Sequence, residues 1–359
     1  MNIVFISCTF LVALATLLPL SRNPHWIFRG MDFPRLQISL FAAILLLAML
    51  LFSEPAALSW ALMGITALCF LWQFWWILPY TPLWLKEVKA TKKDNPQAQI
   101  SLITSNVLTP NKNSEGLIRL VEKYQPDILV TLESDQWWQD QLKVLEKAMP
   151  HTIKCPLDNL YGMHVYSKLP LHNGEVSYLV EEDVPSIHAS VELRNGHHVR
   201  MHFVHPAPPS PTENEESAER DAELIIVARS VAKSDQPIIV TGDLNDVAWS
   251  STTRLFRKIS GLLDPRVGRG MYNTFHADYP LLRWPLDHIF HSHHFTLRHI
   301  ELLPTIGSDH FPLYTVLTFN PIKGVKQNGL EAEKEDHERA ADIADEMEVS
   351  KNDVPKPNT

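Results

Sequence analysis

The sequence predicts an α/β protein in which two mixed β-sheets pack face to face with helices outside them, a four-layer α/β sandwich, preceded by an N-terminal helical transmembrane segment. Three observations predict this fold. Residues 1–90 contain three apolar runs that are almost free of charge. From residue 98 the chain changes to a strand–helix–strand pattern, which is typical of α/β units. Later strands come in bunches with few helices between them, which favours two packed sheets.

The three apolar runs cover residues 3–20, 36–52 and 56–78. Each is about as long as a helix that crosses a hydrocarbon core of roughly 30 Å. The first run could also be a signal peptide, but it lacks a basic start and a small-residue cleavage site. Tryptophans crowd the end of the third run, as is usual at a membrane interface. We therefore expect residues 1–90 to be a membrane anchor with three transmembrane helices.

Loop charges predict the orientation of this anchor. The loop after the first run carries Arg22, Arg29 and Arg35, whereas the loop after the second carries only Glu54. Lysines again follow the third run. Because basic loops tend to stay in the cytoplasm, the sequence predicts a multi-pass integral protein of the (inner) membrane. Its N-terminus would lie outside and its large C-terminal part on the cytoplasmic side.

Composition divides the rest of the chain into three parts. Residues 91–97 are polar and contain proline, so we expect a linker there. Residues 98–320 carry the alternating apolar elements of a folded domain. Residues 321–359 are acidic and almost devoid of large apolar side chains, which predicts a disordered tail. A short helix over residues 332–347 is an open alternative.

The charge of the chain disfavours a grip on long nucleic acid, and its cysteines rule out a disulfide framework or a cysteine-based zinc site. The formal net charge is -9, and acidic residues exceed basic ones in the folded domain. Proteins that grip long nucleic acid usually present a basic face, and the composition gives no such sign. The three cysteines are widely spaced, so neither a disulfide framework nor a zinc-type spacing is available.

Short apolar runs predict the strands of the folded domain, and 3.6-residue spacing predicts its helices. The expected helices cover residues 114–123 and 216–232. The expected strands cover residues 100–105, 127–132, 163–166, 187–193, 199–204, 238–241, 288–290 and 314–319.

Polar residues follow several of these strands at the point where each strand ends. Such residues converge on one crevice in α/β sheets, and carboxylate and amide oxygens there suit Mg²⁺ or Mn²⁺. A histidine beside an aspartate in a tight turn can take a proton from water. The polar segments are Ser105-Asn106, Leu132-Glu133-Ser134, Val204-His205-Pro206, Gly242-Asp243-Leu244-Asn245, and Asp287-His288 together with Ser308-Asp309-His310.

Each segment also has a simpler interpretation. Asn106 could be a turn or cap residue, Glu133 an ordinary charge near a helix start, and His205 a loop residue before proline. Residues 242–245 could form a plain β-turn. The order and joint occurrence of the segments favour a common site over these separate interpretations.

That order resembles the endonuclease/exonuclease/phosphatase superfamily, which includes deoxyribonuclease I, exonuclease III and the inositol-polyphosphate 5-phosphatases. The resemblance covers residues 100–319, and its strongest motifs are Gly242-Asp243-Leu244-Asn245 and Gly307-Ser308-Asp309-His310. The segment that begins at His205-Pro206, together with three preceding membrane spans, is similar to a bacterial membrane-anchored branch. The resemblance implies that residues 98–320 are a catalytic domain.

The resemblance also implies a metal site. Glu133 would be the principal magnesium ligand, with Asn106 next to it on the metal or the phosphate. Asp309 would contribute to the same site. Mg²⁺ would be the cofactor, with Mn²⁺ as a possible substitute.

Further residues receive catalytic roles by the same resemblance. His310 would be the base that activates water, and Asp287 would hold its other ring nitrogen. Asp243 would position the nucleophile or protonate the leaving oxygen. Asn245 and His205 would hold the phosphoryl oxygens. These roles fit an in-line attack of water, which needs a base on one side and donors on the equatorial oxygens.

Two weaker candidates could contact the substrate. Tyr161 could do so or could pack at the rim, and Arg220 could reach a phosphate or pair with a glutamate on its own helix. A tract with His291, His293, His294 and His299 could bind zinc, although its spacing argues against this.

These expectations describe a membrane-anchored magnesium-dependent phosphoesterase that hydrolyses phosphodiester or phosphomonoester bonds. Its partners would be the bilayer and a phosphoester substrate, either nucleic acid or a lipid or small-molecule headgroup; no protein partner can be inferred. Two alternatives are a catalytically inactive membrane scaffold and a nuclease that acts specifically on DNA or RNA. Transport by the spans is disfavoured because no charge lies inside them.

Overall fold

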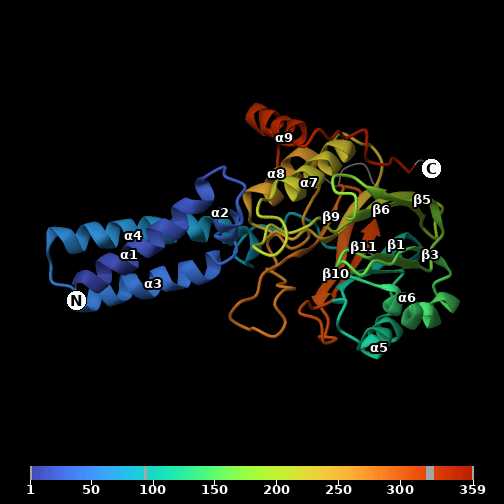
Figure 1. Cartoon of the computed structure of the whole chain (residues 1–359), viewed down its shortest axis with the longest axis horizontal. Coiled ribbons are helices and arrows are strands. Elements are labelled where there is room, and N and C mark those ends of the chain that lie inside the picture. The colour runs from blue at the N-terminus through green and yellow to red at the C-terminus, as the bar shows by residue number, and fades with distance from the viewer. Residues whose placement is uncertain (1, 93–94, 321–326, 358–359) are drawn as a thin grey trace. The chain divides into compact units, whose positions relative to one another are not determined.

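The computed structural model of the chain describes residues 2–92, 95–320 and 327–357. It divides into two compact units, whose elements are labelled in Figure 1. Unit 1 contains the chain up to Leu85 together with Pro209–Ser217 and Gly268–Gly270. Unit 2 contains the other segments, Lys86–Pro208, Ala218–Val267 and the chain from Met271 onward.

Unit 1 is helical. Three of its helices are long and apolar enough to cross a membrane, over Ile3–Leu20, Arg35–Phe52 and Ala57–Tyr80, as the sequence predicts. Many leucines on these helices are exposed, which suits a lipid environment. The elements are α1 (Asn2–Leu17), η1 (Leu18–Leu20), α2 (Trp26–Gly30), α3 (Arg35–Phe52), α4 (Ala57–Ile77) and η2 (Leu78–Tyr80).

Polar side chains tie these helices together. Arg35, the first residue of α3, forms a buried ion pair with Asp32 and donates to Gln73 Oε1 at 2.9 Å. Gln73 in turn donates to Thr16 Oγ1 of α1 at 3.1 Å. These hydrogen bonds link α1, α3 and α4, as expected of polar groups buried in an apolar environment.

Unit 2 is built on two mixed β-sheets. The first has the strand order β10-β11-β1-β2-β4-β3 and the second the order β5-β6-β7-β8-β9. Each contains one parallel pair, β1 with β2 and β7 with β8, whose crossover runs through a helix. The strands of the first sheet are β1 (Gln99–Asn106), β2 (Ile128–Leu132), β3 (His151–Cys155), β4 (Met163–Ser167), β10 (Phe295–Leu302) and β11 (Leu313–Phe319). Those of the second are β5 (Leu171–Tyr178), β6 (Pro185–Glu192), β7 (His198–Val204), β8 (Ile238–Asp243) and β9 (Asp287–His291).

Helices cover the outer faces of both sheets and complete the predicted four layers. Alternate apolar residues of the two sheets meet in the central core, where Ile100 and Phe203 are fully buried. Trp138 and its neighbours fill a second core under α5 (Ser114–Tyr124) and α6 (Gln136–Leu142). A third core lies under α7 (Ala218–Val231), α8 (Ser251–Ser260) and α9 (Lys334–Glu346).

The C-terminal segment differs from the expectation of disorder over residues 321–359. Its described part contains α9, whose Ala340 and Ala344 are buried in the core it shares with α7 and α8. A capping box at Glu333 and Asp336 starts this helix, and Lys258 pairs with Asp336 at 2.7 Å. The segment therefore folds in spite of its acidic composition, because one narrow face of α9 carries alanines that pack against the core. Residues 321–326 and 358–359 lie outside the described part.

The predicted linker also begins inside folded structure. Thr91 N donates to Leu297 O of β10 at 2.8 Å, and its hydroxyl lies 3.0 Å from that of Thr296. The chain therefore joins unit 2 before residue 91. Residues 93–94 of the predicted linker lie outside the described residues.

Candidate active site

The ends of five strands carry the predicted site residues to one edge of unit 2. Asn106 ends β1, and Glu133 follows β2, its parallel neighbour. Asp243 ends β8 and stands directly opposite Asp287, the first residue of β9. His310 precedes β11, whose register places it beside β1. Sheet register thus assembles residues that are far apart in the sequence.

His310 lies between two carboxylates. Its Nδ1 is 2.7 Å from Asp287 Oδ2 and its Nε2 is 3.5 Å from Asp243 Oδ2. All three side chains are buried. Burial by itself lowers the pKa of His310, but the charges of Asp287 and Asp243 outweigh it and raise the pKa to about 10.

Asp243 anchors the turn that follows β8. Its Oδ1 accepts from Asn245 N at 2.9 Å, and Asn245 Nδ2 donates to Pro206 O at 3.0 Å. Gly242 is required here because a Cβ would lie 1.9 Å from Val204 O of the neighbouring strand. Burial raises the pKa of the Asp243 carboxyl, although the charge of His310 opposes this.

Glu133 and Asn106 form the second half of the site. Asn106 Nδ2 lies 2.7 Å from Glu133 Oε1 and 3.3 Å from Asp243 Oδ2, so it links two carboxylates. Glu133 Oε2 is buried and has no hydrogen-bond partner among the described residues. Burial raises the pKa of Glu133 to about 7, against the opposing hydrogen bond from Asn106. Its φ of 56° is unusual for a non-glycine residue and is typical of functional turns.

These features fit a divalent cation. A buried carboxylate oxygen without a donor, near further carboxylates, is stabilised by a hard cation that accepts oxygen ligands. Asp309 is half-buried and close enough to raise the pKa of Glu133 by its charge. Among the described residues, the tightest cluster of potential ligands is instead Asp243, Asp287 and His310. Asp287 Oδ1 in that cluster is buried without a hydrogen-bond partner among the described residues as well, so both the cluster and the Glu133–Asn106 pair have the ligands to hold a cation.

His205 and Tyr161 lie together at the same edge. Their ring centroids are 5.4 Å apart. Burial lowers the pKa of His205 to about 4, so its imidazole is neutral at pH 7. Its Nδ1 has no hydrogen-bond partner among the described residues, which leaves it available to a substrate oxygen.

Arg220 occupies a different position from the one expected of a phosphate ligand. It is fully buried, and its guanidinium donates to Asp221 Oδ1 at 2.8 and 3.0 Å and to Asn245 O at 2.9 Å. These contacts make it a support for the turn that carries Asn245. Its contact with substrate stays a prediction that the geometry does not favour.

Sequence reasoning missed the residues that hold Asp287. Arg266 donates to Asp287 O at 3.3 Å and to His288 Nδ1 at 2.7 Å, while pairing with Asp264 at 2.9 Å. The Thr274 hydroxyl accepts from Asp287 N at 3.1 Å. The phenyl ring of Phe275 lies 4.9 Å from the His310 ring. No local motif marks these residues, since each acts through a neighbour distant in sequence.

The histidine tract at residues 291–299, whose spacing argues against zinc, does not gather into a metal cluster in the part of the chain that the structure describes. His291 is buried and bonded through Nδ1 to Ser292 O at 2.9 Å. His299 lies 3.2 Å from Glu301 at the surface.

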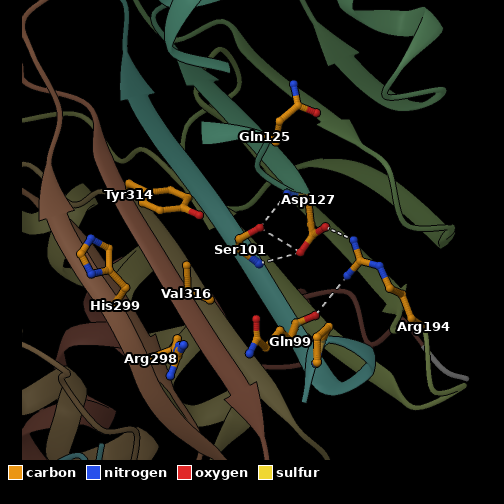
Figure 2. A pocket seen from close by; sticks show the side chains of 10 residues that line it. Gln99, Ser101, Gln125, Asp127, Arg194, Arg298, His299, Tyr314 and Val316 are labelled. Carbon is orange, nitrogen blue, oxygen red and sulfur yellow. Dashed lines mark hydrogen bonds and ion pairs between the residues drawn. The ribbon is translucent and has the colours of Figure 1, made fainter. Parts of the chain in front are cut away.

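A separate pocket of about 710 Å³ lies where β1 and β2 begin (Figure 2). Asp127 accepts there from Ser101 N and Oγ, both at 2.9 Å, and forms an ion pair with Arg194 (Figure 2). Tyr314 and Arg298 line the same pocket. Because the catalytic candidates stand at the other ends of these strands, the pocket is not part of their site.

The fold and the site define a class of protein. The model of the Endonuclease/Exonuclease/phosphatase family matches residues 103–310, more than half of the chain. The chain therefore belongs to this family. A search among curated proteins finds no significant match.

Solved structures show the same fold at low sequence identity. TDP2 of D. rerio in complex with a single-strand DNA product is 17% identical, with a TM-score of 0.53 over 62% of this chain and 99% of that one. The human nocturnin catalytic domain with bound sulfate is 19% identical, with a TM-score of 0.52 over 64% and 96%. A family protein from Beutenbergia cavernae is 16% identical, with a TM-score of 0.50 over 62% and 72%.

Proposed function

We propose that the chain is a divalent-metal-dependent phosphoesterase anchored in a membrane. One observation carries the proposal. Asn106, Glu133, Asp243, Asp287 and His310 meet at one edge of two sheets, and a buried carboxylate oxygen there has no donor. Family membership supports the same class of reaction.

Glu133 and Asn106 would hold the cation, with Asp309 beside them. Their oxygens are hard ligands of the kind that Mg²⁺ prefers, and Mn²⁺ accepts the same set. When bound, the cation would supply positive charge against the negative charge that develops on the phosphoryl group.

The role of His310 as the base stays a prediction from the sequence, and the raised pKa of His310 favours a second assignment. A histidine with a pKa of about 10 is already protonated at neutral pH and is a poor base. We propose that Asp243, whose pKa is raised by burial, receives the proton of the attacking water. His310 would remain an imidazolium that faces the phosphoryl oxygens, with Asp287 fixing its ring.

Neutral donors would complete the phosphate site. Asn245 is held by its bonds to Asp243 and Pro206, and His205 offers an unpaired Nδ1. Tyr161 packs beside His205 and would line the entrance. Fixed donors of this kind stabilise an in-line displacement without reorganising during the reaction.

The alternatives are less well supported. The D. rerio TDP2 structure contains a DNA product, which keeps a nuclease as the second candidate. The net charge of -9 weighs against a grip on long nucleic acid. An inactive scaffold would have no need for a strained glutamate and an unpaired buried oxygen at the same place. The three apolar helices support a multi-pass membrane location, and we propose that unit 2 faces the cytoplasm.

A substrate panel tests the proposal. The full chain in detergent would be given DNA, RNA, nucleotides, inositol phosphates and phospholipids, with and without Mg²⁺. We expect magnesium-stimulated hydrolysis of at least one class, and its loss in Glu133→Gln and His310→Ala. If the chain cleaves none of these esters, the catalytically inactive scaffold becomes the favoured interpretation. A protein whose two variants retain full rate would show that the site is elsewhere.

A further inference from the structure

A short hairpin rises directly from the candidate active site. Phe275 and Trp284 pair at its base, with Phe275 N donating to Trp284 O at 3.0 Å. On its other side Phe275 pairs with His310, and Ala277 N donates to Asp309 O at 2.7 Å. We call residues 275–284 the site hairpin; it lies in the orange loop of Figure 1. Its base is thus bonded to the His310 motif itself.

The tip of the site hairpin is apolar and exposed. Tyr279 is 57% exposed, Leu281 84% and Leu282 47%. Among the described residues of unit 2, six large apolar side chains are exposed, and three of them lie within this four-residue stretch. An exposed cluster of large apolar side chains is typical of a surface that a membrane or another molecule covers.

The tip is also held in place. Tyr279 N donates to His276 O at 3.3 Å, and Leu282 N donates to Tyr279 O at 2.9 Å. Arg283 donates to Ala277 O at 2.9 Å and its guanidinium lies 4.9 Å from the centre of the Phe311 ring. The exposed leucines therefore sit on a braced turn, which presents them at little entropic cost.

Three observations point to a lipid surface as the occupant. The same chain carries three helices long and apolar enough to span a membrane. Gly268–Gly270, which precedes the site hairpin in the chain, belongs to unit 1, where Gly268 N donates to Pro79 O at the end of the third span. The tip combines leucines, a tyrosine and a proline, the composition of interfacial segments.

The charge of the hairpin fits a lipid surface better than nucleic acid. The hairpin has one aspartate, Asp278, and one arginine, Arg283, and no lysine, so it offers no excess of Lys or Arg to a phosphate backbone. Insertion would be driven by apolar burial and would depend little on salt.

We propose that the tip of the site hairpin inserts into the bilayer surface and brings the His310 site to phosphoester headgroups of membrane lipids. The docking half of this proposal is independent of catalysis. The substrate half rests on the proposed phosphoesterase function and narrows it to lipid headgroups.

A fluorescence experiment tests docking without any reaction. In the full chain with Cys8, Cys69 and Cys155 replaced by alanine, Leu281→Cys carries an environment-sensitive fluorophore. Val144→Cys, at a site that is 64% exposed in the same unit, is the matched control. The protein is placed in phosphatidylcholine/phosphatidylglycerol nanodiscs with or without brominated acyl chains. We expect a blue shift and bromine quenching at position 281 and neither at position 144.

Equal quenching at the two positions would overturn docking. So would a blue shift at position 281 without quenching, since a second copy or another protein would then cover the tip. A hydrogen-exchange measurement on the unaltered chain covers the case in which the cysteine variants fail to fold. Hydrogen exchange of residues 278–283 in the unaltered chain should slow in lipid discs relative to detergent monomers, and unchanged exchange would count against insertion.

An activity ratio tests the substrate half. The variant Leu281→Ser/Leu282→Ser is compared with Val144→Ser on phospholipid vesicles and on soluble bis(p-nitrophenyl) phosphate. Loss of two leucines that would insert into the bilayer should lower the ratio of vesicle to soluble hydrolysis by about tenfold or more. An unchanged ratio overturns the substrate half. If the wild type cleaves soluble esters but not lipids or their free headgroups, the phosphoesterase stands and only the lipid assignment falls.

Discussion

His310 Nδ1 and Asp287 Oδ2 are 2.7 Å apart in a buried contact, and the contact joins the turn before β11 to the start of β9. It links the two sheets, because β11 belongs to the first and β9 to the second. This one contact therefore fixes the position of the histidine ring over the site and places a carboxylate charge against its Nδ1.

Replacing Asp287 tests this contact. Asp287→Asn keeps the shape but removes the charge that raises the pKa of His310, so the imidazole should lose its proton at a lower pH. We expect kcat to fall by about a hundredfold or more, as for other orienting carboxylates. The pH–rate profile is the decisive readout: the alkaline limb of the wild type, near pH 10, should move down in the variant. An identical limb in both proteins would show that His310 does not control the rate.

Glu133 should destabilise the metal-free protein when ionised. Its folded pKa is raised from 4.5 to about 7, so the stability present below pH 4.5 is lost as the pH rises through 7. The loss is at most about 3 kcal/mol, from 1.36 kcal/mol per pKa unit. Glu133→Gln should remove this dependence and raise the thermal midpoint in EDTA at pH 8. Mg²⁺ should raise the midpoint of the wild type but not that of the variant. A variant less stable than the wild type in EDTA contradicts the assignment.

Buried neutral histidines should make unit 2 sensitive to acid. Burial lowers the folded pKa of His188 to about 3 and of His205 and His164 to about 4, below the unfolded value near 6.5. Because the unfolded chain then binds more protons, stability falls as the pH drops below about 6.5. In a Glu133→Gln background, which removes the opposing dependence, thermal midpoints measured from pH 6.5 to 5 should decline. A His188→Gln variant should show a shallower decline, and parallel curves would count against this origin.

Gly242 should tolerate no side chain. The Cβ of Gly242→Ala would approach Val204 O to 1.9 Å, so β8 must move away from β7 and carry Asp243 with it. We expect a loss of several kcal/mol in stability, of the order seen for overpacking and backbone strain, and a loss of activity. Gly64→Ala is the control, since nothing lies within 4 Å of its added Cβ. Chemical denaturation and hydrolysis rates measure both effects; a stable, active Gly242→Ala would contradict the close strand approach.

The apolar core of the fold could be predicted from the sequence, and its polar edges could not. The run at residues 100–105 lies within β1 and the run at 238–241 within β8, because both strands are buried on both faces. β5 was missed since its exposed, polar residues give no apolar run. α8 was missed because its core face combines Leu255 and Phe256 with threonines and an arginine.

The site could be predicted only as far as its residues stand in short motifs. Asn106, Glu133, Asp243, Asp287 and His310 come together as expected. Their supports could not be predicted, because the partners of each lie elsewhere in the chain. Arg266 pairs with His288 across 22 positions and Arg220 holds Asn245 O across 25. These pairs exist only once the strands are in register.

The most direct test of the account is the initial rate of phosphoester hydrolysis by the full chain as Mg²⁺ is titrated after removal of all metal. We expect no activity at zero Mg²⁺, saturation as the metal is added, and a Glu133→Gln variant that stays inactive at every concentration. Hydrolysis that proceeds in EDTA, or a variant that reaches the wild-type rate, would contradict it.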